Sequence, residues 1–198
     1  GCRDEEGSVI KEVLASAELI GRYVEPEVHL KLCLSHLKSA STTSMQQTAN
    51  VLKILTALVK GTSGERIQPH LKGICDAIVN PDVCDTESGD NQAQLLCLVN
   101  VTTSKSGDQC KQYSLQLFVV VLYVMSLQRE GILDEMINNC LDSIAVCLQF
   151  QSTGELYKLH AKDVVEKLKE SHTEWTSHSS SRLLFSTLLL NAGPVVGT

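Results

Sequence analysis

The residues best suited to metal chemistry lie in the stretch HLKLCLSHLK, residues 29–38. His29, Cys33 and His36 are spaced i, i+4 and i+7, which places them along one stripe of a helix. Imidazole and thiolate groups are ligands that zinc and related metals favour. A zinc site would also need a fourth ligand, for which His70 or Cys75 could serve, and hydrogen bonds that orient the ligands.

The same three residues, named here the His/Cys stripe, also fit the packed interior of a helical protein. Leucines and Val28 flank the stripe, and Glu27, Lys31 and Lys38 lie on the opposite face. A neutral histidine with one hydrogen-bond partner and a small apolar cysteine satisfy such a position without a metal. We therefore predict that the stripe is buried packing, and that the chain uses no metal ion and no cofactor.

A second group of functional side chains occurs in SHTEWTSH, where His172 and His178 flank the single tryptophan, Trp175. We interpret Trp175 as filling a gap between two helices, with a small recognition epitope as the alternative. Catalytic motifs do not occur in the sequence: GTSGER at 61–66 lacks the lysine of a P-loop, and neither G-x-S-x-G nor H-E-x-x-H is present. The sequence therefore predicts a protein that is not an enzyme.

The composition indicates a folded helical protein and argues against two classes of partner. Of the 198 residues, 43% are hydrophobic, 20% are charged and only 4% are aromatic, so Leu, Val and Ile must form the core. The net charge of −6, without a basic stripe, argues against nucleic acid and anionic membranes. The longest apolar run, LFVVVLYVM at 117–125, is shorter than the roughly 20 residues of a membrane-spanning helix.

The eight cysteines are spread along the chain without a C-x-x-C pair. Most lie beside Leu, Ile or Val in predicted helices, as small buried thiols do. This pattern is typical of a reduced, intracellular protein. The Gly-Cys start in place of a Met is interpreted as a cut inside a longer protein.

Every long segment has apolar residues at helical spacing. The predicted helices span 8–24, 26–38, 44–60, 65–79, 92–104, 109–128, 132–149, 154–172 and 180–191. Pro26 suits a first helical turn, Gly61 is predicted to be a C-terminal glycine cap, and Pro69 marks a late start or a kink. The valines at 119–121 favour a strand, but no second strand is indicated, so a buried helix is predicted there.

The predicted helices recur in pairs. The first helices begin near residues 26, 65, 107 and 153, so successive pairs are 39, 42 and 46 residues apart. A two-helix unit of about 40 to 47 residues is typical of HEAT-type repeats, which stack into a superhelix. The predicted fold is therefore an all-α HEAT-type superhelix, a single array over residues 1–198, with a closed helical bundle as the competing architecture. About four helix pairs follow a leading half-unit, and the units are 8–24, 26–61, 65–104, 107–149 and 153–192.

In such arrays the second helix of each pair lines the concave side, where partners bind. The candidate protein-binding residues are Gln46, Asn50, Lys53 and Lys60 on one second helix, Glu135, Asn138 and Asp142 on another, and Trp175. For any single one of them an ordinary solvated surface is the simpler interpretation. On the second of these helices, Leu133, Ile137, Leu141 and Ile144 are spaced for burial against the apolar helix 112–127.

Four stretches together resemble the C-terminal part of the HEAT-repeat dynein axonemal assembly factors. They are GRYVEPEVHLKLCLSHLK, IQPHLKGI, YSLQLFVVVLYVM and ELYKLHAKDVVEKLKESHTEWTSHS, and the resemblance covers about residues 20 to 190. The last stretch is the most specific, whereas the segments 80–91 and 104–110 match poorly.

The resemblance implies a cytoplasmic, non-enzymatic scaffold for preassembly of the outer and inner dynein arms of motile cilia. The implied partners are dynein arm chains, among them an intermediate chain, and other assembly factors or chaperones. The alternative is a HEAT-repeat scaffold of another pathway, of the transport or phosphatase-subunit kind.

Overall fold

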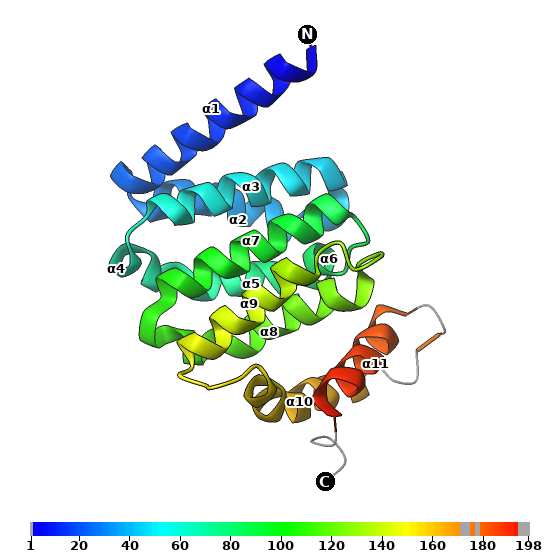
Figure 1. Cartoon of the computed structure of the whole chain (residues 1–198). Coiled ribbons are helices and arrows are strands. Elements are labelled where there is room, and N and C mark those ends of the chain that lie inside the picture. Colours follow the sequence, from blue (N-terminus) through cyan, green and yellow to red (C-terminus); the bar gives the residue numbers. More distant parts are fainter. Residues whose placement is uncertain (1, 171–174, 177–178, 194–198) are drawn as a thin grey trace.

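The computed structural model describes residues 2–170, 175–176 and 179–193, and these residues form helices and connecting turns without any β-strand (Figure 1). The α-helices are α1 (Cys2–Tyr23), α2 (Pro26–Lys38), α3 (Met45–Gly61), α4 (Gly64–Ile67), α5 (Leu71–Ile78), α6 (Pro81–Cys84), α7 (Gly89–Ser106), α8 (Cys110–Leu127), α9 (Asp134–Cys147), α10 (Gly154–Lys169) and α11 (Ser180–Ala192). Three 3₁₀ turns, η1 (Ala40–Thr42), η2 (Gln68–His70) and η3 (Gly107–Gln109), connect them. The all-α prediction is confirmed, and the valines at 119–121 lie inside α8.

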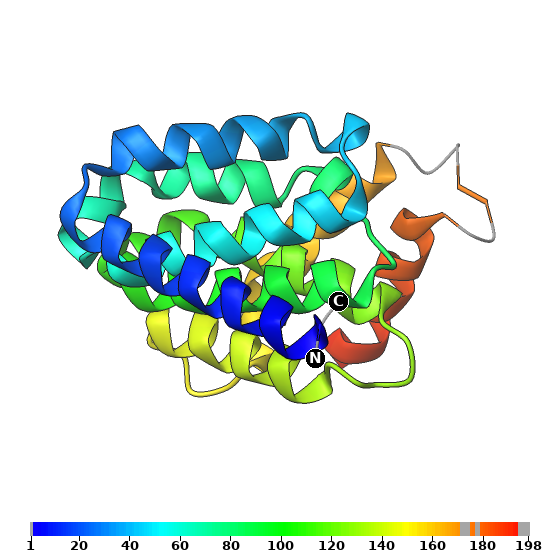
Figure 2. The ribbon, with the colours of Figure 1, turned by 90° about the horizontal axis from the view of Figure 1, so that it is seen from above.

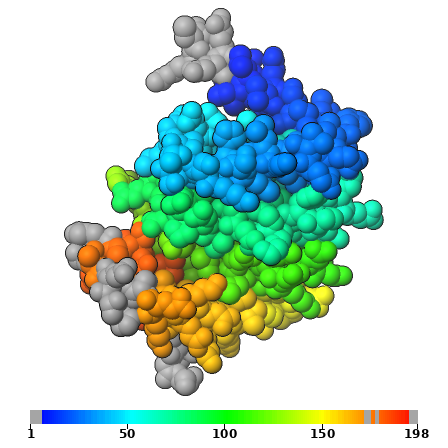
Figure 3. Space-filling view, turned by 180° about the vertical axis from the view of Figure 1, so that it is seen from behind, coloured from blue at the N-terminus to red at the C-terminus, as the bar shows by residue number. Residues whose placement is uncertain are grey.

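The helices stack in two layers. Helices α1, α3, α7 and α9 pack on one another in that order and form the second-helix layer, and α2, α5, α8 and α10 form the first-helix layer. Figure 2 shows α3 lying between α1 and α2 when the stack is seen from above. The space-filling view in Figure 3 shows the successive units as tiers, from blue at the N-terminal end to orange. This stacking of helix pairs is the HEAT-type architecture that the repeat period predicts.

Local sequence signals set where several helices begin. Ser44 and Gln47 form a capping box at the start of α3, in which the Ser44 hydroxyl accepts a hydrogen bond from the Gln47 backbone N–H at 3.2 Å. Pro26 occupies the first turn of α2, as predicted. Pro69 divides the predicted helix 65–79 into α4, the turn η2 and α5, because proline has no N–H to continue the helical ladder.

Glycines at 21 and 61 allow α1 and α3 to cross closely. A Cβ atom at Gly21 would lie 2.1 Å from the carbonyl oxygen of Leu58, and one at Gly61 would lie 1.9 Å from the carbonyl oxygen of Glu18. No side chain fits at such distances. The predicted glycine cap at 61 is therefore wrong: Gly61 ends α3 without a positive φ, and it is required by the helix crossing instead.

Helix α8 lies at the centre of the packing and contacts α5, α7, α9, α10 and α11. Its only charged residue is Lys111. Among the described residues, Gly89–Leu127 alone is long and apolar enough to cross a membrane, judged by length and composition. The structure divides this segment into α7 and α8 at Gly107, whose φ is +51°, and the two helices pack against each other.

The last helix departs from the layered pattern. Helix α11 packs mainly on α8 and α10, and the second-helix layer stops at α9.

The predicted buried face of α9 is confirmed, since Leu133, Ile137, Leu141 and Ile144 are all at most 9% exposed. Their apolar partner is α8, as the sequence predicts.

A buried histidine connects α10 to α8. The His160 ring nitrogen Nε2 lies 3.1 Å from the Ser114 hydroxyl, and the ring packs against Phe118 with centroids 5.6 Å apart. Burial lowers the pKa of His160 below its ordinary value of 6.5, and the Asp163 carboxylate opposes this effect only in part. His160 is therefore neutral in the folded protein near pH 7.

We expect Leu141→Arg to lower the free energy of unfolding by about 3 kcal/mol or more, because an unpaired charge would face α8. In a chain of this size this corresponds to a fall in melting temperature of about 10 °C. Asp142→Arg is the matched control, since Asp142 is exposed and its variant should melt like the parent. Paired thermal melts measure both, and a Leu141→Arg variant as stable as the parent would show that α9 buries a different face.

We also expect a pH dependence that comes from His160. The pKa of His160 is lower in the folded protein than in the unfolded chain. As the pH falls, the unfolded chain therefore binds a proton at this histidine before the folded protein does. The stabilisation is complete above about pH 6.5 and declines below it. The variant His160→Gln, whose side chain does not titrate, should have a free energy of unfolding about 1 kcal/mol lower than the parent at pH 7. Between pH 7 and about pH 5.5 the variant should lose less stability than the parent. Denaturant unfolding at both pH values measures this, and equal pH dependence in the two proteins would contradict it.

Candidate functional site

A groove lies on the second-helix layer between the N-terminal halves of α1 and α3. Its volume is about 490 Å³, and we name it the α1–α3 groove. Its lining residues are Val9, Ile10, Val13, Leu14, Gln46, Asn50, Lys53 and Ile54. The structure thus brings together three of the predicted protein-binding residues, Gln46, Asn50 and Lys53, beside apolar side chains from α1.

The polar side of the α1–α3 groove is held by local interactions. The Gln46 side-chain amide donates to the Asn50 side-chain oxygen at 3.3 Å. The Lys53 ammonium pairs with Asp90 at the start of α7, with 3.0 Å between Nζ and Oδ2. The Lys53 side chain is only 24% exposed, so the ion pair holds it in place as part of the groove wall. The pair also links two repeats, because Lys53 lies on α3 and Asp90 on α7.

The apolar side of the groove is open to solvent. Val9, Ile10 and Val13 are 58%, 47% and 47% exposed, although each is a large aliphatic residue. Clustered exposed apolar side chains with polar residues at the rim are a common sign of a protein-binding surface. The arrangement can bury apolar side chains of a partner and offers amide groups for hydrogen bonds, but it holds no catalytic group.

The other predicted binding residues lie elsewhere. Lys60 is two helical turns along α3 from Lys53 and pairs with Glu18 on α1 at 3.2 Å. Glu135, Asn138 and Asp142 are exposed on α9. They face away from α7, because the side of α9 that contacts α7 carries other residues: the Ser143 hydroxyl donates to the Asn100 oxygen at 2.9 Å, and the Cys140 thiol approaches the Leu96 carbonyl at 3.2 Å.

Trp175 lies near α11, apart from the α1–α3 groove. It is half-buried, and its ring packs against Phe185 with centroids 5.6 Å apart. Its interpretation as a side chain that fills a gap between two helices stays a prediction. His172 and His178, which flank Trp175 in the sequence, lie outside the described residues.

The His/Cys stripe is only partly buried, so its prediction as core packing is right for Cys33, right in part for His29, whose ring nitrogens are shielded from solvent, and wrong for His36. Cys33 is 7% exposed, His29 is half-buried and His36 is exposed. The reason is that α2 turns Leu30 and Leu37 towards the core, which leaves the stripe at the edge of the buried face. Val28 and Leu32, which were expected to flank a buried stripe, are 69% and 64% exposed.

The surroundings of His29 favour its neutral form. Burial lowers the pKa of His29, and the nearby Arg66 guanidinium and the His70 ring lower it further. Both ring nitrogens of His29 are shielded from solvent, and neither has a hydrogen-bond partner at ordinary distance and angle among the described residues. Within the described part of the chain, no three His, Cys, Asp or Glu side chains are arranged to hold a metal ion.

The buried thiols are poor nucleophiles. Burial raises the pKa of Cys75, Cys84, Cys110 and Cys140 to about 12. A thiol needs to ionise to react, so these side chains act as small apolar core residues near pH 7.

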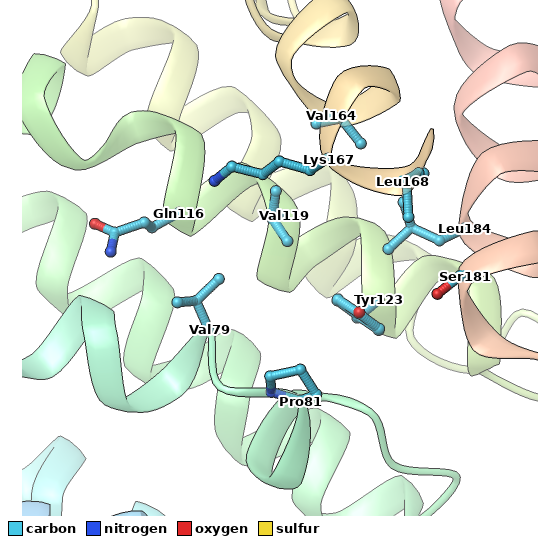
Figure 4. A pocket seen from close by; sticks show the side chains of 10 residues that line it. All are labelled: Val79, Pro81, Gln116, Val119, Tyr123, Val164, Lys167, Leu168, Ser181 and Leu184. Carbon is cyan, nitrogen blue, oxygen red and sulfur yellow. The ribbon is translucent and has the colours of Figure 1, made fainter. Parts of the chain in front are cut away.

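A second groove, of about 410 Å³, lies on the first-helix side (Figure 4). We name it the α8–α10 groove, and its lining residues are Val79, Pro81, Gln116, Val119, Tyr123, Val164, Lys167, Leu168, Ser181 and Leu184. Sequence analysis missed it. The spacing of Gln116, Val119 and Tyr123 at i, i+3 and i+7 was available as a signal, but α11 closes one side of the groove only by leaving the repeat pattern.

The stacked helix pairs define a helical-repeat protein of the HEAT type. Comparison with known families agrees and is more specific. Residues 1–128 match the family model for the dynein axonemal assembly factor 5 HEAT-repeat domain. The chain therefore belongs to this family, which is a non-catalytic kind of protein.

The curated relatives are much longer than this chain. Dynein axonemal assembly factor 5 of Homo sapiens and that of Mus musculus are each 34% identical to it over 197 residues, which is 99% of this chain and 22% of the relative. The Xenopus laevis protein of the same name is 32% identical over 197 residues, 99% of this chain and 23% of its own length. No solved structure matches the chain significantly.

We predict that the His/Cys stripe binds no metal in solution. Elemental analysis of the purified chain should find no stoichiometric zinc, and a chelator should leave the melting temperature unchanged. Cys33→Ala serves as the comparison, since it removes the best-placed thiol and should not alter the response to the chelator. A loss of more than about 3 kcal/mol on chelation of the parent would show a metal that supports folding.

Proposed function

We propose that this chain is part of a non-enzymatic cytoplasmic scaffold on which outer and inner dynein arms are preassembled for motile cilia. In this role it binds dynein arm chains, among them an intermediate chain, and other assembly factors or chaperones. Membership of the assembly-factor family supports the pathway. The fold supports the mode of action, because stacked helix pairs supply extended surfaces for partners.

The α1–α3 groove is the proposed docking site, and its exposed apolar wall is the observation that carries this assignment. Val9, Ile10 and Val13 are available for a partner without unfolding any part of the structure. Asn50 and Gln46 stand at the rim, where polar contacts select a partner's orientation. Lys53 is held by Asp90, so its part is to position the wall.

The remaining candidate residues have lesser roles in this proposal. Lys60 pairs with Glu18 and supports the crossing of α1 and α3. Glu135, Asn138 and Asp142 form an acidic and amide-rich edge on α9, available to a second partner. Trp175 packs on Phe185 and supports the position of α11.

We expect Val13→Asp to weaken capture of a dynein intermediate chain about tenfold or more, the effect of losing one central contact of an interface. Val13 is 47% exposed, so the substitution should leave the thermal melt nearly unchanged. Leu190→Asp is the matched control, because Leu190 is 84% exposed on α11 and lies outside the groove. The measurement is pull-down of identified chains from ciliating cells with the parent and both variants.

Two results would count against the proposal in different ways. Equal capture of the intermediate chain by the parent and Val13→Asp would show that the α1–α3 groove is not the docking site. Capture of transport or phosphatase partners in place of dynein chains would overturn the pathway and favour a scaffold of another kind.

A further inference from the structure

The α8–α10 groove has walls from three successive repeats. Gln116, Val119 and Tyr123 form one stripe of α8, and Val164 and Lys167 face them from α10 (Figure 4). The segment joining α5 to α6 and the first turns of α11 complete the lining. Most of the side chains are apolar, and the volume of about 410 Å³ lies within the range of sites that receive ligand groups.

Specific hydrogen bonds hold the walls in place. The Ser180 hydroxyl donates to Asp85 at 2.6 Å, which fixes the start of α11 next to α6. The Gln116 side-chain amide donates to Asp76 on α5, also at 2.6 Å. The groove is therefore formed before any partner arrives, because its shape depends on contacts within the chain.

The polar side chains of the α8–α10 groove can all donate hydrogen bonds, and one of them is a cation. Lys167 is the only charged residue that lines it, and among the described residues it has no ion-pair partner, although the whole chain carries a net charge of −6. Figure 4 shows its side chain extending towards the Gln116 end of the groove. The hydroxyls of Tyr123 and Ser181 make no hydrogen bond to another described residue. Burial raises the pKa of Tyr123 to about 12, so its phenol keeps its proton.

We propose that the α8–α10 groove binds an amphipathic helical segment of a partner protein, with apolar side chains in the groove and a carboxylate paired with Lys167. A groove whose one charged side chain is a cation, beside two hydroxyls able to donate, is complementary to an acidic group. The described residues include no strand edge to which an extended peptide could add, and helix-in-groove binding uses apolar anchors at i, i+4 and i+7. This site is on the first-helix side and is independent of the α1–α3 groove.

The test uses three synthetic helical peptides of about 14 residues, with blocked ends and leucines at i, i+4 and i+7. They differ at position i+3, which is glutamate, glutamine or lysine. Each is titrated into the isotope-labelled 198-residue chain, and amide chemical shifts are followed by NMR. We expect shifts at α8, α10 and the start of α11. The glutamate peptide should bind about two- to fivefold more tightly than the glutamine peptide, the range for one exposed ion pair, and the lysine peptide should bind most weakly.

Variants of one helix separate the charge effect from folding. Lys167→Glu should reverse the order, so that the lysine peptide binds best, and Lys167→Gln should remove the preference for glutamate over lysine. Lys162→Glu makes the same charge change on an exposed residue of α10 outside the groove and should leave the order unchanged. Thermal melts of all three variants should match the parent.

Several outcomes would overturn the inference. An order of peptides that Lys167→Glu does not alter would remove the role of the cation. Decanoate shifting the same resonances more strongly than the glutamate peptide would indicate an apolar small-molecule acid as occupant. Shifts of these resonances with protein concentration alone would indicate a second copy of the chain. Absence of any shift at the groove would show that helical segments do not bind there.

Discussion

The architecture depends on one constraint: α8 is apolar on nearly every side, so most of its surface must be covered by other helices. A helix of this kind is stable in water only inside a shell of other helices. In this fold α5, α7, α9, α10 and α11 supply the shell, and Val120, Val121 and Leu122, three consecutive residues of α8, are all fully buried. The need to cover the last side of α8 accounts for the position of α11, which packs there in place of extending the second-helix layer. The α8–α10 groove is what this cover leaves open.

The two ends of the second-helix layer differ in chemistry. At α1, aliphatic side chains such as Ile10 and Val13 face solvent, whereas the free edge of α9 carries Glu135, Asn138 and Asp142. Repeat arrays commonly have a polar outer face on a terminal unit, because no further unit covers it. The close crossing at Gly21 and Gly61 keeps α1 attached to α3 while its N-terminal half diverges, and this divergence opens the α1–α3 groove.

Sequence reasoning succeeded where burial and periodicity determine the result. The all-α fold, the helix at 119–121 and the buried face of α9 follow from spacing alone. It failed where the decisive contact is between segments distant in the chain. Gly61 looks like a cap locally, but its function depends on Glu18 of another helix. The His/Cys stripe was misplaced because Val28 and Leu32 are apolar yet exposed, so composition could not identify the buried side of α2. The α8–α10 groove needs α11 in a place that no local pattern specifies.

The central position of α8 also has a consequence in time. A chain emerges from the ribosome N-terminus first, at roughly 5 to 20 residues per second. Helix α8 ends at residue 127 and α11 ends at residue 192, so the helix that closes its last side is finished 65 residues later. At these rates the synthesis of 65 residues takes roughly 3 to 13 seconds. During that interval a strongly apolar surface is exposed on a nascent chain, and the order in which the helices are made leaves it in need of temporary protection from aggregation.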